Sequence, residues 1–90
     1  MNMKAKLKTK QQLPKWFKGE LYEEGAVVQN RFGGDSIELN NVELSMYDFV
    51  MGCVIMSEMG NRDTKLITEL RKGLDWFRIN NAKAYMILLD

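Results

Sequence analysis

The chain has 90 residues, of which 46% are hydrophobic and 28% are charged, and its formal net charge is +1. This length suits one domain, because two halves would each bury too little apolar surface to offset the entropy of ordering their backbones. The composition excludes a disordered chain, and the absence of histidine excludes catalytic triads, Cys-His pairs and zinc-water sites within one chain.

The N-terminal part of the chain is basic. The first nineteen residues carry six lysines and no acid, whereas the remainder carries seven basic and twelve acidic residues. Residues 1–12 lack sustained apolar periodicity, so we expect a basic flexible arm there, with a short basic edge strand as the alternative, and a single α+β domain over residues 13–90. Leu13-Pro14 marks the entry to the domain, because the residue before proline disfavours helix, and Trp16 and Phe17 are expected to anchor it.

The same basic segment is a candidate nucleic-acid contact. Lysines neutralise phosphates, and an aromatic ring can stack on an unpaired base. Against this interpretation, terminal lysines commonly serve solubility, and the segment has no arginine to recognise base edges. The candidate contacts are Lys4, Lys6, Lys8, Lys10, Lys15, Trp16 and Lys18.

Residues 20–40 predict a small antiparallel sheet or hairpin of two or three strands. Short apolar groups at residues 21–22, 26–28 and 37–39 are separated by turn residues. Gly33-Gly34 can supply the positive backbone dihedrals of a tight turn, and Asp35-Ser36 can close it by local hydrogen bonds. This glycine pair lacks the following lysine and helix of a phosphate-binding loop, so a hairpin turn is the better interpretation.

The period then changes to that of a helix over about residues 41–59. Asn40 or Asn41 is the expected cap, with Glu43 spaced for a capping box. Apolar residues lie almost all around this helix, which is unusual in so small a domain. Gly60-Asn61 predicts its end.

A second main helix begins at Asp63 or Thr64 and has one apolar stripe that ends at Phe77. Asn80-Asn81 can close it and open a short C-terminal helix over residues 82–89. Trp76 and Ile79 lie off the stripe and are expected to pack on the sheet or on another chain.

The surplus apolar surface of the first helix has two explanations. One is self-association through a surface formed by Tyr47, Met51, Ile55, Trp76 and Ile79. The other is a central helix, with the sheet on one side and the C-terminal helices on the other. The sequence leaves both open.

No group of residues predicts a catalytic, metal or cofactor site. The acid pairs Glu23-Glu24 and Asp48 with Glu58 lack metal-loop spacing and are best explained as surface charge. The single Cys53 is expected to be a buried hydrophobe in a reducing compartment. The chain shows neither a secretory signal nor an apolar run long enough to cross a bilayer. We therefore expect a cytoplasmic protein that is not an enzyme.

Three stretches carry a resemblance: LPKWFKGE from Leu13, ELSMYDFVMG from Glu43 and AYMILLD from Ala84. Together they resemble small proteins encoded by marine cyanophages and their relatives. The resemblance implies expression in the cytoplasm of a cyanobacterial host during infection, where such proteins often bind host proteins or nucleic acid. It carries no catalytic residue, ligand or named fold to any position.

The sequence therefore predicts a small non-enzymatic interaction or regulatory protein, expected to be homodimeric and to bind an unidentified host or phage macromolecule. The alternative is a nucleic-acid-binding accessory protein that uses the lysine-rich arm.

Overall fold

The structure is a computed structural model that describes residues 11–90, so Lys4, Lys6, Lys8 and Lys10 of the predicted arm lie outside the described residues. Two strands, β1 (Ala26–Gln29) and β2 (Ser36–Leu39), precede the helices α2 (Asn41–Glu58), α3 (Thr64–Asn80) and α4 (Ala82–Ala84). A π-helical turn, η1 (Tyr85–Leu89), continues α4 to the end of the chain. This order confirms the predicted α+β fold.

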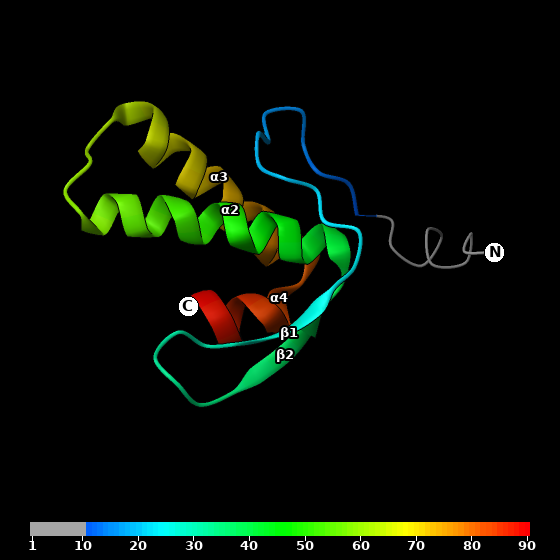
Figure 1. Cartoon of the computed structure of the whole chain (residues 1–90). Coiled ribbons are helices and arrows are strands. Elements are labelled where there is room, and N and C mark those ends of the chain that lie inside the picture. Colours follow the sequence, from blue (N-terminus) through cyan, green and yellow to red (C-terminus); the bar gives the residue numbers. More distant parts are fainter. Residues whose placement is uncertain (1–10) are drawn as a thin grey trace.

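Helix α2 lies at the centre of the domain. Figure 1 shows α3 on one side of it, and the β1-β2 hairpin with α4 on the other. The helix is therefore central, as one of the two explanations predicts. The difference is that α4 lies on the same side of α2 as the hairpin, whereas α3 lies on the opposite side. One long face of α2 is left without a neighbouring element among the described residues.

The two strands form an antiparallel hairpin in which Val28 pairs with Ile37. Both of these side chains are half-buried against the domain, whereas Val27 on the other face is exposed. The turn uses Gly33 and Gly34 at φ of 95° and 94°, a region that side chains with a Cβ disfavour. This confirms the predicted function of the glycine pair.

The segment at Tyr22, one of the predicted strand signals, does not join the sheet. Its backbone N–H donates to Ser45 Oγ (2.9 Å), and its carbonyl accepts from Asn41 Nδ2 (3.2 Å). The Tyr22 hydroxyl also donates to Asp48 Oδ2 at 2.7 Å. Polar side chains of α2 thus satisfy backbone groups that a third strand would have paired.

The helix ends follow the local signals in the sequence. Asn40 and Glu43 form the capping box of α2, and Gly60, at φ 99°, follows the last turn of that helix. Asp63 caps α3 by accepting from the Lys65 N–H. Asn81 ends α3 and caps α4 through its side chain, as the sequence predicts.

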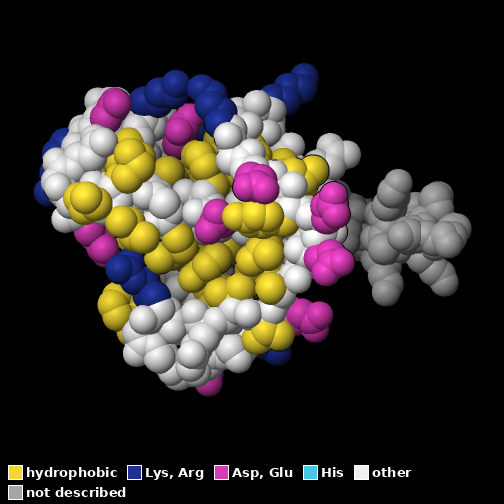
Figure 2. Space-filling view, viewed as in Figure 1, with side chains coloured by type: hydrophobic (Ala, Val, Ile, Leu, Met, Phe, Trp, Pro, Cys, Tyr) yellow, Lys and Arg dark blue, Asp and Glu magenta, His cyan; other side chains and the backbone are white. Residues whose placement is uncertain are grey.

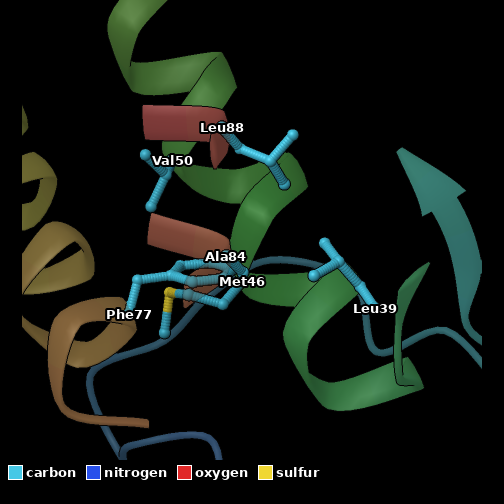
Figure 3. Packing of buried hydrophobic residues seen from close by; sticks show 6 residues of the cluster. All are labelled: Leu39, Met46, Val50, Phe77, Ala84 and Leu88. Carbon is cyan, nitrogen blue, oxygen red and sulfur yellow. The ribbon is translucent and has the colours of Figure 1, made fainter. Parts of the chain in front are cut away.

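One core joins all of these elements. Figure 3 shows its six buried hydrophobic residues, contributed by β2, α2, α3, α4 and η1: Leu39, Met46, Val50, Phe77, Ala84 and Leu88. Helices α2 and α3 approach closely at Gly73, where an added Cβ would lie 2.5 Å from Val50 Cγ2. Because the core is shared, the hairpin is held by the helices and not by its own strand pairing.

Hydrogen bonds to the helices begin at Gln11, the first described residue. Gln11 Nε2 donates to Glu43 Oε2 at 2.8 Å and to the Asn80 carbonyl at 3.1 Å. The Gln12 carbonyl accepts from Trp76 Nε1 at 3.1 Å. Both glutamines therefore bond to groups on α2 and α3 that lie far from them in the sequence.

Candidate interaction surfaces

The face of α2 that no described element covers carries an apolar stripe. Met51 and Ile55 lie four residues apart on one side of α2, and Met59, the C-cap residue after its last turn, continues the four-residue spacing. Met51 is half-buried, whereas Ile55 is 47% exposed and Met59 is 80% exposed. We call these three residues the α2 stripe. Figure 2 shows hydrophobic side chains gathered along α2 and between α2 and the hairpin.

A shallow pocket of about 200 Å³ borders this stripe. Its walls come from the hairpin loop, the C-terminal half of α2 and the end of η1, and include Phe32, Met51, Val54 and Leu89. Phe32 stands at its rim and is 84% exposed. Exposed aromatic and methionine side chains beside a pocket are common at protein interfaces.

The hairpin loop that carries Phe32 is fixed to the helices. The two terminal guanidinium nitrogens of Arg31 donate to the Glu58 carboxylate, at 3.2 and 3.0 Å, and Asn30 Nδ2 donates to the Ile87 carbonyl at 2.8 Å. The Arg31 guanidinium also lies 5.0 Å from the centroid of the Phe32 ring. These contacts hold the rim of the pocket in one position.

The five residues predicted for self-association do not form one surface. Met51 and Ile55 belong to the α2 stripe, and Tyr47 lies one turn before them, half-buried, with its ring nearly perpendicular to that of Phe77 (6.5 Å between centroids). Burial raises the pKa of the Tyr47 phenol, and Arg31 opposes that rise.

The two α3 residues lie elsewhere. Trp76 is half-buried, packs on Phe77 and bonds to Gln12. Ile79 is 82% exposed and lies two residues, about 200° of helix, beyond the buried Phe77, so it faces away from the core. The apolar stripe of α3 in the sequence could not show how Trp76 and Ile79 are directed relative to α2.

A second surface forms where residues 11–18 run antiparallel along α3. Gln12 lies at Trp76, Trp16 lies beneath the Lys72 ammonium (5.8 Å from its ring centroid), and Lys18 lies beside Lys65. The aromatic anchors hold this segment, because Trp16 and Phe17 pack on Phe49 of α2 at 5.9 and 5.3 Å between centroids. We call Lys15, Lys18, Lys65 and Lys72 the basic face.

Lys65 and Lys72 of this face had no signal in the sequence, since only the fold brings α3 to the N-terminal segment. The nearby Lys65 ammonium lowers the pKa of Lys18, while the charge of Glu69 acts in the opposite direction. The sequence suggested Trp16 as a ring that could stack on an unpaired base, but in the structure Phe49 and Lys72 already contact that ring. Trp16 positions the segment and offers no free ring for a base.

The buried polar groups of the described chain are accounted for by structural bonds. The Glu43 carboxylate, on a residue only 5% exposed, accepts from Gln11, the Asn40 backbone and Asn81. Burial, followed by the charge of Glu69, raises the pKa of the Cys53 thiol, which disfavours the reactive thiolate. Within residues 11–90, no group of three His, Cys, Asp or Glu side chains is placed to hold a metal ion.

Comparison with protein-family models, curated proteins and solved structures finds no match to this chain. Among residues 11–90, no helix combines the length and the hydropathy needed to span a bilayer.

Proposed function

We propose that this chain is a small non-enzymatic interaction protein that pairs with a second copy of itself through the α2 stripe. The observation that carries the proposal is the exposure of Ile55 on the central helix and of Met59 at its C-cap, beside the pocket rimmed by Phe32. Covering apolar surface stabilises a complex by roughly 25 cal/mol for each Å² removed from water, and contiguous exposed apolar patches mark interaction sites.

The shape of the helix supports a second copy as the partner. A stripe on one straight helix can pack against the same stripe of a two-fold related copy, because each residue then meets an equivalent set. Gly52 lies on the exposed side of α2, where an added Cβ would meet nothing within 4 Å. The missing side chain leaves room for close approach of the two helix backbones.

Sedimentation velocity of the full chain over a wide concentration range tests this proposal. We expect the wild type to form dimers, and Ile55→Glu and Met59→Glu to be monomeric with unchanged circular dichroism, because a buried unpaired carboxylate opposes association. Met86→Glu is the matched control, since Met86 is 67% exposed on η1 and lies outside the stripe.

A wild type that stays monomeric throughout would contradict the pairing. Ile79→Glu distinguishes an interface on α3 from one on α2. If this variant abolished dimers while Met59→Glu left them intact, the interface would lie on α3 and the proposal would be wrong. With the resemblance to cyanophage proteins, the proposal extends to a paired protein that meets a host macromolecule in the cytoplasm of an infected cyanobacterium.

A further inference from the structure

The basic face belongs to a wider separation of charge along the chain. Residues 20–60 contain one basic and eight acidic side chains, whereas residues 61–83 contain six basic and three acidic ones. Residues 11–19 add two lysines and no acid. The fold places these two basic stretches together, because residues 11–18 lie along α3, and dark-blue side chains follow the same upper edge of the molecule in Figure 2.

The lysines of this face are spaced for extended contact. Lys65 and Lys72 are seven residues apart on α3, which is two turns and about 10 Å along the helix axis. Lys18 lies beside the first of them, and Lys72 covers Trp16. Glu69 is the one acid of α3 between the two lysines, so positive charge prevails along the row.

We propose that the basic face binds the phosphate backbone of duplex DNA, independently of base sequence and independently of the pairing through α2. Lysines are compact charges that contact phosphates without identifying bases. Duplex is favoured over single-stranded nucleic acid because Phe49 and Lys72 hold the Trp16 ring, so the face lacks the open aromatic platform on which unpaired bases stack.

Fluorescence anisotropy with the full-length protein and two labelled duplexes of unrelated sequence tests the proposal. We expect binding at about 50 mM salt that weakens steeply towards about 200 mM, with similar affinity for both duplexes. Lys65→Gln and Lys72→Gln should each make the plot of log affinity against log salt shallower by about 0.9, the contribution of one phosphate contact.

Lys83→Gln is the matched control, because it removes the same charge from an exposed position on α4, outside the basic face. Its salt dependence should equal that of the wild type. Circular dichroism of each variant verifies that the fold is retained.

Three results would overturn the inference. One is a lack of duplex binding at about 50 mM salt, and the second is a Lys65→Gln or Lys72→Gln variant that behaves like Lys83→Gln. The third is salt-sensitive self-association without DNA that both Lys65→Gln and Lys72→Gln abolish. That result would mean that the basic face binds the acidic residues 20–60 of a second copy. A single-stranded oligonucleotide of the same sequence should bind more weakly; tighter binding to it would contradict the choice of duplex.

Discussion

At the residue scale, Glu43 connects three parts of the chain. One of its carboxylate oxygens accepts from both Gln11 (2.8 Å) and Asn81 (2.9 Å), and the other accepts from the Asn40 N–H at 3.0 Å. Glu43→Ala would leave these donors without an acceptor in a buried place. We expect it to lower the free energy of unfolding by about 2 to 3 kcal/mol, measured by urea denaturation.

Two variants give this prediction its controls. Glu43→Gln keeps one acceptor oxygen and should lose less stability than Glu43→Ala. Glu38→Ala removes an exposed acid from β2 and should change stability by no more than about 0.5 kcal/mol. Equal losses for Glu43→Ala and Glu38→Ala would show that the three bonds contribute nothing.

The helical glycines give a second prediction at this scale, in which the same substitution has opposite effects. At Gly52 an added Cβ meets open space, so Gly52→Ala should raise the free energy of unfolding by about 0.5 to 1 kcal/mol through helix propensity. At Gly73 the Cβ would lie 2.5 Å from Val50 Cγ2, and forcing α2 and α3 apart costs about 1 to 3 kcal/mol. Thermal and urea unfolding of monomeric samples should show Gly73→Ala as the less stable protein, and the reverse order would contradict the packing at this crossing.

At the scale of elements, the hairpin loop is held by two different kinds of bond. Asn30 Nδ2 donates to the Ile87 carbonyl and its Oδ1 accepts from the Phe32 N–H, both at 2.8 Å and the first partly buried. The Arg31-Glu58 pair is largely exposed. We therefore expect Asn30→Ala to cost about 1 to 2 kcal/mol and Arg31→Ala less than about 1 kcal/mol.

Hydrogen exchange locates the effect of this loop. Asn30→Ala should speed exchange of the η1 amides, because it frees the C-terminal turn from the hairpin, whereas Arg31→Ala should leave η1 unchanged. Faster η1 exchange in Arg31→Ala alone would mean that the ion pair, and not the Asn30 amide, fixes the C-terminal turn.

The elements that the sequence predicts well are those whose ends depend on neighbouring residues. The capping box of Asn40 and Glu43, the two-sided cap at Asn81 and the Gly33-Gly34 turn all act within a few residues, so their patterns are visible in one stretch of sequence. The extended segment at Tyr22 was wrong as a strand signal because its partners are side chains of α2, more than eighteen residues away.

At the scale of the whole molecule, the candidate surfaces were predictable only in part. The stripe residues Met51 and Ile55 follow from periodicity, but the position of Phe32 beside them depends on how the hairpin loop is fixed to α2 and η1. The sequence predicts only two residues of the basic face, because Lys15 and Lys18 lie in a basic segment. Lys65 and Lys72 join them only through the packing of residues 11–18 along α3. Patterns within one element do not contain such information.

The shared core has a consequence for the unfolding of the whole domain. Leu39 is the one fully buried side chain of the hairpin, and it belongs to the core cluster that also contains residues of α2, α3, α4 and η1. A two-stranded hairpin is marginal alone, so we expect sheet and helices to unfold together. Leu39→Ala should lower the free energy of unfolding by about 2 to 5 kcal/mol while far-ultraviolet circular dichroism and tryptophan fluorescence keep one common midpoint.

Val27→Ala is the control for this prediction, because Val27 lies on the opposite face of β1 and is 69% exposed; its midpoint should move by no more than the equivalent of about 0.5 kcal/mol. Tryptophan fluorescence reports Trp16 and Trp76, which lie where residues 11–18 meet α3, whereas circular dichroism reports mainly the helices. Separate midpoints in Leu39→Ala would mean that this N-terminal segment and the helical core are independent units. In that case the basic face could unfold while the α2 stripe stayed folded, and the two surfaces would have different free energies of unfolding. A common midpoint means that both surfaces depend on the single core that contains Leu39.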